Sequence, residues 1–178
     1  MLMDVPYTLD NLFIADERGY FSKCYVKENY SNLENCFDCS EVFFSASKRG
    51  VIRGMHFQTR NPQAKLVTVV KGAVFDVVVD LRKDSQTFGQ YSFFELSNQN
   101  HKALYIPAGF AHGFQALEKE NIMLYMCHGK YDKETDSGIR FDDSDIGIQW
   151  PLMDEVIVGS RDSELMSFEN FKRTIGGL

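Results

Sequence analysis

Two short stretches place polar side chains among residues that favour β-strands. The first runs from Val51 to Val70 and reads Val-Ile-Arg-Gly-Met-His-Phe-Gln, a short polar break, then Gln-Ala-Lys-Leu-Val-Thr-Val-Val. The second is Ile106-Pro-Ala-Gly-Phe-Ala-His-Gly-Phe114. Polar groups are costly to bury unless each of them finds a partner. We therefore expect the two stretches to be neighbouring strand ends that line one pocket.

Short strand-like runs follow one another along most of the chain, with turn residues between them. Such spacing is typical of an antiparallel barrel or jelly roll, rather than of alternating strands and helices. At 178 residues, we expect a single domain over residues 1–178. The predicted strands are Glu41–Phe44, a strand from Gly50 onward, Leu66–Val70, Ala73–Leu81, Tyr91–Leu96, Ala103–Ile106, Phe114–Leu117 and Ile122–Cys127.

The connections between these strands carry their own predictions. Lys71-Gly72 and the segment Glu118–Asn121 are each expected to close a hairpin. The run Ala73–Leu81 is apolar on both faces, which indicates a central, covered strand. Residues 25–35 suggest a short helix, residues 128–150 a long ordered loop, and Ser163–Thr174 a helix on the surface or at an interface.

Composition excludes several classes of partner. The formal net charge is −6 and no block of Lys and Arg is present, which argues against nucleic-acid binding. No run approaches the roughly 18 apolar residues that span a membrane, and the N-terminus does not resemble a signal peptide. Four cysteines in such a chain suggest reduced thiols in the cytoplasm. Cys36 and Cys39 have metal or redox spacing, but we interpret this single half-site as incidental.

A metal centre is also disfavoured. Barrels of the cupin kind often hold a metal through His-x-His, a Glu and a later His. This chain has His56-Phe-Gln58 and Pro107-x-Gly-x-x-His112, so the second His and the Glu are missing. Two imidazoles and one amide are a poor ligand set for Zn²⁺ or Fe²⁺. We therefore expect the pocket to work without a metal or another cofactor.

The remaining polar residues suggest acid–base chemistry. His56 alone could be a satisfied core histidine, but alternation places Lys65 on the same face as Val67 and Val69. A neutral His oriented by Asp162, a nearby Lys ammonium and the Tyr125 hydroxyl form a consistent set. The imidazole would remove a proton next to a carbonyl, the ammonium would stabilise the enolate, and the phenol would return a proton from the other face.

Arg53 does not fit strict alternation, which places it on the face opposite His56. Two explanations remain open. Gly54 introduces a bulge that brings both side chains to one face, or Arg53 serves another surface, such as that of a partner subunit.

Several motifs follow one another along the chain: Arg-Gly-Met-His-Phe-Gln, Gln-Ala-Lys-Leu-Val, Val-Phe-Asp-Val-Val-Val-Asp-Leu-Arg, Ser-Gln-Thr-Phe-Gly, Ile-Pro-Ala-Gly-Phe-Ala-His-Gly-Phe and Asp-Ile-Gly-Ile-Gln-Trp-Pro. Together they resemble the dTDP-4-dehydrorhamnose 3,5-epimerase family, in order over about residues 14–162. The resemblance implies a metal-free cupin jelly roll and a homodimer that exchanges strands. It also implies an isomerase that inverts C3 and C5 of a nucleotide-linked 4-keto-6-deoxy sugar on the route to rhamnose, without a cofactor.

The same resemblance implies roles for individual residues. His56 matches the base, Asp162 the carboxylate that orients it and Tyr125 the acid. The residues matching substrate contacts are Lys65 and His112 around the sugar carbonyl, Arg18, Arg53 and Arg161 as cationic or polar contacts, Tyr131 as the aromatic near the nucleotide, and Asp136 in place of a Glu.

The chain departs from the family pattern at substrate-contacting positions. Glu41-Val42-Phe43 replaces Gln-Asp-Asn, Lys23 replaces a Glu, and Lys130 replaces the first Tyr of a Tyr-Tyr pair. These departures keep alternatives open: a single-centre epimerase or isomerase for a CDP-, GDP- or UDP-linked keto-sugar, a binding module without catalysis, or a metallo-oxygenase. Tyr125 and Asp162 argue against mere binding, because binding needs no proton donor opposite a base.

Overall fold

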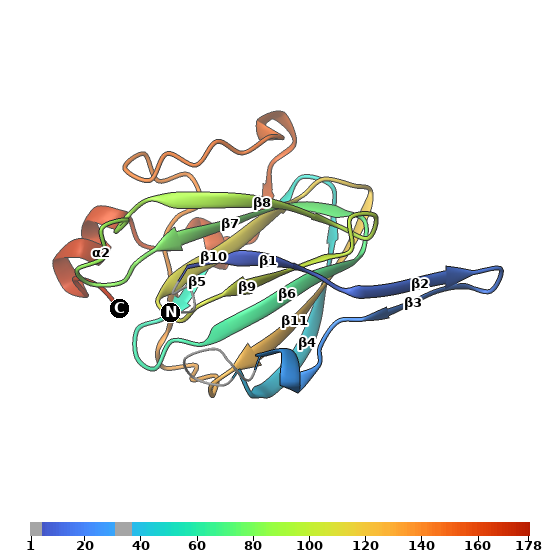
Figure 1. Cartoon of the computed structure of the whole chain (residues 1–178). Coiled ribbons are helices and arrows are strands. Elements are labelled where there is room, and N and C mark those ends of the chain that lie inside the picture. The colour runs from blue at the N-terminus through green and yellow to red at the C-terminus, as the bar shows by residue number, and fades with distance from the viewer. Residues whose placement is uncertain (1–4, 31–36) are drawn as a thin grey trace.

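Two antiparallel sheets form the body of the protein (Figure 1), for which a computed structural model describes residues 5–30 and 37–178. The first sheet has the order β1 (Tyr7–Asp10), β9 (Lys102–Ile106), β6 (Ala64–Lys71), β11 (Glu120–His128) and β4 (Cys39–Lys48). The second has the order β12 (Asp136–Gly138), β5 (Val51–Gln58), β10 (Phe110–Ala116), β7 (Ala73–Asp80) and β8 (Tyr91–Ser97), and β13 (Ile157–Val158) pairs with β5 in parallel. The predicted antiparallel jelly roll is confirmed.

The two predicted hairpins are wrong. β6 and β7 meet at Gly72 but belong to different sheets, and so do β10 and β11, which flank residues 117–119. Each turn carries the chain across from one sheet to the other, so that both sheets can close over a shared core. Gly72 has a φ of +81°, and a Cβ there would lie 2.4 Å from the Glu120 carbonyl oxygen, so the turn requires glycine.

β7 is central and covered, as its apolar sequence predicts. Val74 and Val78 point into the barrel and pack with Val67, Leu104 and Phe114. The other face of the strand packs against the C-terminal part of the chain, in a cluster that contains Phe75, Val77, Val79, Trp150, Phe168 and Phe171. Because both faces of β7 are buried, its side chains cannot alternate between polar and apolar.

The C-terminal helix is part of this second cluster. α2 (Phe168–Thr174) begins after Ser167, whose side chain accepts a hydrogen bond from the backbone N–H of Asn170. Its Phe168 and Phe171 are buried against the outer face of the second sheet. The predicted surface helix is therefore confirmed over Phe168–Thr174, where one face packs on the core and the other is exposed. A four-residue helix, α1 (Ser160–Ser163), comes just before it.

Shorter elements complete the chain. The 3₁₀ helix η1 (Lys27–Tyr30) lies in the region where a short helix was predicted, and residues 31–36 of that region lie outside the described residues. Residues 128–150 form the predicted loop, interrupted by β12, and a second 3₁₀ helix is η2 (Met153–Glu155). β2 (Leu12–Asp16) and β3 (Gly19–Lys23) form a hairpin that projects away from the barrel (Figure 1). No described helix has the length and apolar character to cross a membrane.

Candidate active site

A bulge in β5 explains the position of Arg53. His56 pairs with His112 of β10, and Arg53 pairs with Phe114. The two positions are therefore three residues apart on β5 but two residues apart on β10, so β5 contains one extra residue. Arg53 donates hydrogen bonds to the Ser47 hydroxyl and the Ala46 carbonyl of β4, in the facing sheet. The first of the two explanations is thus confirmed. Gly54 is required here, because its φ is +126° and a Cβ would lie 2.5 Å from the Gly113 Cα.

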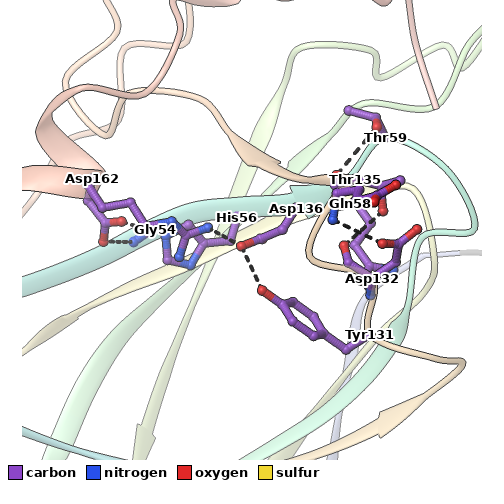
Figure 2. A network of polar contacts seen from close by, with 11 residues as sticks. Gly54, His56, Gln58, Thr59, Tyr131, Asp132, Thr135, Asp136 and Asp162 are labelled. Atoms are coloured by element: carbon purple, nitrogen blue, oxygen red, sulfur yellow. Dashed lines mark hydrogen bonds and ion pairs between the residues drawn. The ribbon is translucent and has the colours of Figure 1, made fainter.

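His56 and Asp162 form a hydrogen-bonded pair (Figure 2). The His56 Nε2 atom lies 2.7 Å from Asp162 Oδ1, and Asp162 Oδ2 accepts a hydrogen bond from the Gly54 backbone N–H at 3.0 Å. Burial acts to raise the pKa of Asp162, but the His56 interaction and the Gly54 N–H outweigh it and hold this pKa below its usual value. An ionised Asp162 accepts a hydrogen bond from the Nε2–H of a neutral imidazole, which leaves Nδ1 as the basic nitrogen.

His56 lines a cavity of about 330 Å³ at one end of the barrel. The cavity collects five of the predicted site residues: His56, Lys65, Tyr131, Asp136 and Arg161. Sequence reasoning gave no role to other side chains in the lining, among them Gln63, Phe110 and Cys127, and treated Glu41 and Phe43 only as departures from a pattern. Gln63 and Phe110 stand in the quoted motifs Gln-Ala-Lys-Leu-Val and Ile-Pro-Ala-Gly-Phe, which was the signal that could have found them.

Lys65 contributes an ammonium group to the lining of this cavity. Burial lowers the pKa of its ammonium group, although Cys127, Asp136, Asp76 and Glu41 act in the opposite direction. Cys127 is the cross-strand partner of Lys65, and burial raises the pKa of its thiol to about 11. A poorly hydrated cation interacts strongly with a negative charge that develops nearby.

His112 is buried directly beside His56 and has a carboxylate of its own. Its Nε2 atom lies 3.0 and 2.9 Å from the two carboxylate oxygens of Asp76, on β7. Burial raises the pKa of Asp76, and the interaction with His112 works against that rise. Sequence reasoning missed Asp76 as a site residue. Its signal was an acidic side chain inside the Val-Phe-Asp-Val run, which must find a partner when buried.

Tyr125 lies behind the lining of the cavity. It is the cross-strand partner of Phe43, and the two rings stack with centroids 4.6 Å apart. Its ring centroid is 6.0 Å from that of His112. Burial raises the pKa of the Tyr125 phenol, while Ser45 and Arg53 lower it. The phenol therefore keeps its proton at neutral pH and can act only as an acid or a hydrogen-bonding group.

Asp136 joins two other predicted residues at the mouth of the cavity. Its Oδ2 atom accepts hydrogen bonds from the Tyr131 hydroxyl at 3.1 Å and from Arg161 Nη2 at 2.7 Å. Gln58 holds the adjoining loop, since its side chain accepts from the Asp132 N–H and donates to the Lys130 carbonyl. Figure 2 shows the Asp136–Tyr131 contact on the side of His56 away from Asp162.

Arg18 lies apart from the other predicted residues. It is at the turn of the β2–β3 hairpin, its side chain is 84% exposed, and it pairs with Asp16. Cys36 lies outside the described residues, so its relation to Cys39 is not tested. Within residues 5–30 and 37–178, no group of three or more His, Cys, Asp or Glu side chains is arranged to hold a metal ion.

Comparison with known proteins identifies the family. The family model for dTDP-4-dehydrorhamnose 3,5-epimerase matches residues 4–170. The chain belongs to this family. A dTDP-4-dehydrorhamnose 3,5-epimerase from Methanothermobacter thermautotrophicus is 48% identical over 152 residues, which are 83% of this chain and 81% of the relative. One from Salmonella typhimurium is 41% identical over 150 residues, which are 81% of this chain and 80% of the relative.

A solved member of the 3,5-epimerase family has the same fold. The dTDP-6-deoxy-D-glucose-3,5-epimerase from Legionella pneumophila, in complex with dTDP-4-keto-L-rhamnose, is 35% identical with a TM-score of 0.89. The match covers 95% of this chain and 90% of that one. The protein is accordingly an enzyme of the isomerase class with a cupin-type jelly roll, as the sequence predicts.

Proposed function

We propose that the protein inverts C3 and C5 of a dTDP-linked 4-keto-6-deoxyhexose, of the kind that yields dTDP-4-dehydrorhamnose. The observation that carries this proposal is the His56–Asp162 pair at the wall of a cavity that also contains Lys65. The substrate class follows from the family and from the Legionella relative, which binds dTDP-4-keto-L-rhamnose.

The chemistry begins with His56. The C4 ketone acidifies the hydrogens on C3 and C5, and the basic nitrogen of His56 removes one of them. The electron pair of that C–H bond forms an enolate whose negative charge rests on the C4 oxygen. We assign the stabilisation of this oxygen to Lys65, which lines the cavity, and to the buried His112–Asp76 pair. Because only protons move, the reaction needs neither a redox cofactor nor a metal.

Tyr125 supplies the second proton. The phenolic hydrogen passes to the carbon on the face opposite His56, the enolate electron pair forms the new C–H bond, and the charge moves to the phenolate oxygen. Exchange with water then resets both groups. The raised pKa of Tyr125 ensures that the phenol is protonated when the enolate forms.

The mouth of the cavity would hold the nucleotide. Arg161 is exposed at this mouth and Arg53 is also exposed, on β5, so both can pair with phosphate oxygens. Tyr131, at 46% exposure, offers a ring on which a base can stack. Asp136 holds Tyr131 and Arg161 in place before substrate arrives.

The active form that we propose is a homodimer with exchanged strands, in the cytoplasm. The projecting β2–β3 hairpin exposes Leu12, Ile14, Tyr20 and Phe21, each at more than half of its surface. Apolar side chains on an arm with no barrel beneath them favour contact with a second copy. In such a dimer, Arg18 at the tip of the arm would reach the partner's cavity. The described Cys24, Cys39 and Cys127 are free thiols, which suits a reducing compartment.

Incubation with dTDP-4-keto-6-deoxyglucose in D₂O tests the function. We expect deuterium at both C3 and C5, together with a product of inverted configuration, detected by NMR. CDP-, GDP- and UDP-linked 4-keto sugars serve as parallel substrates. Label at C3 alone, or turnover only of another nucleotide sugar, would contradict the proposal.

A further inference from the structure

β4 carries two side chains that contact Tyr125 and have no role in the chemistry described above. In β4 the side chains of Phe43, Ser45 and Ser47 lie on one face of the sheet, and on the neighbouring strand β11 Tyr125 is paired with Phe43 and Met123 with Ser45. Ser47 binds Arg53, whereas Phe43 and Ser45 contact the phenol.

Phe43 covers the Tyr125 ring. The two planes are 12° from parallel with centroids 4.6 Å apart, and Phe43 lines the cavity while Tyr125 lies behind it. A phenol ring rotates about two side-chain bonds, and a stacked partner restricts that rotation. The stack therefore fixes the direction in which the Tyr125 hydroxyl points.

Ser45 lies two residues after Phe43 on β4, diagonally across from Tyr125 of β11. Its hydroxyl oxygen is buried and has no hydrogen-bond partner among the described residues. A buried hydroxyl without a partner is costly, so its hydrogen is available to a charge that forms nearby. Burial raises the pKa of Tyr125 and Ser45 is the main group that lowers it, which indicates that Ser45 favours the phenolate.

We propose that Phe43 and Ser45 are positioning residues for Tyr125. Phe43 holds the ring so that the phenol faces the enolate carbon, and Ser45 donates a hydrogen bond to the phenolate that remains after the proton has left. This inference rests on the proposed function, because it assigns both residues to the reprotonation step. His56 acts before that step, so proton abstraction does not depend on them.

The consequence is a separation of exchange from inversion. When the phenol is misplaced or its anion is unsupported, the enolate takes a proton back from the His56 side. That proton has exchanged with solvent, so the substrate gains deuterium without inverting. A purely structural defect lowers deuterium exchange and inversion in proportion.

The experiment compares Ser45→Ala and Phe43→Leu with the parent protein in D₂O. The measured quantity is the ratio of deuterium incorporated to product inverted, and we expect it to rise roughly tenfold in each variant. Ser45→Thr keeps the hydroxyl and should restore the parent ratio. Ser92→Ala and Phe93→Leu are matched controls on β8, since Phe93 also stacks on another ring, at 4.8 Å from Phe75.

The outcomes separate the two levels of the proposal. A parent protein that neither exchanges nor inverts overturns the proposed function itself. The positioning roles alone are overturned if the parent is active but the Ser45→Ala and Phe43→Leu variants keep the parent ratio. The same holds if these variants lose deuterium exchange and inversion in proportion. Should Ser45→Ala fail to fold, Ser45→Cys gives the same comparison, because a thiol is a weaker donor of similar size.

Discussion

His56 and His112 are direct cross-strand partners, and each has a carboxylate of its own. Asp162 binds the histidine that lines the cavity, and Asp76 binds the one buried behind it. The two pairs differ in burial, because the His56 side chain is 27% exposed and that of His112 only 4%. Adjacent strands thus hold one imidazole that can exchange protons with solvent and one that is fixed in the interior.

Asp162→Asn tests whether the carboxylate sets the tautomer of His56. An amide can offer its N–H to Nε2 and so leave the wrong nitrogen basic. We expect kcat for epimerisation to fall by roughly 10²–10⁴-fold, the range for loss of general base catalysis. Asp145→Asn is the control, since Asp145 pairs with Lys172 on the surface. Near-parent activity in Asp162→Asn would contradict the role.

Lys65 should determine the alkaline limit of activity. Burial lowers its pKa below the usual 10.5, so the ammonium loses its proton, and its effect on the enolate, at a pH below that value. Tyr125 does not compete, because burial raises its pKa. In the pH profile of kcat/KM we expect the alkaline limb below 10.5, and in Lys65→Arg the remaining activity should persist to higher pH. An unchanged limb in Lys65→Arg would assign it to another group.

Gly54 should be essential to the bulge that aligns Arg53 with His56. A Cβ at this position would overlap the Gly113 Cα, whereas one at Gly19 would meet nothing within 4 Å at a nearly equal φ of +123°. The two alanine variants therefore share backbone strain and differ in crowding. We expect Gly54→Ala to lose about 1–3 kcal/mol more unfolding free energy than Gly19→Ala, measured in urea. Equal losses would show that the close approach to β10 is unimportant.

Mixing two inactive variants tests whether Arg18 serves the partner's cavity. Arg18→Ala and His56→Ala each damage every site of their own homodimer. In a mixed dimer, one site has both defects and the other has none, so subunit exchange should restore up to about one quarter of parent activity. No recovery after exchange, confirmed by tagged subunits, would mean that Arg18 acts within its own chain or not at all.

Sequence patterns predicted the strands and the neighbouring positions of β5 and β10, but not the sheets that two of the turns connect. The apolar run of β7 marked it as central, and the predicted boundaries of β8 and β9 were close to the observed ones. The turns at Gly72 and residues 117–119 looked like hairpins because local sequence records only that the chain reverses. Whether it returns in the same sheet depends on how two sheets close over a core, which is a long-range property.

In the site too, features recorded in the local sequence were predicted and features that depend on distant strands were not. His56, Lys65, Tyr131, Asp136 and Arg161 were predicted from motifs, and the structure brings them to one cavity. The partners that set their chemistry were harder to find. Asp76 was hidden in an apolar strand, and alternation alone left the bulge at Gly54 as one of two explanations for Arg53. Such features depend on contacts between strands far apart in the chain.

Deuterium exchange by His56→Ala is the most direct test of the central claim, that this imidazole removes the proton next to the ketone. The variant and the parent protein are incubated in D₂O with dTDP-4-keto-6-deoxyglucose, and label at C3 and C5 is followed by NMR. We predict rapid label at both carbons with the parent and none above the enzyme-free rate with His56→Ala. Exchange at the parent rate in folded His56→Ala would contradict the account.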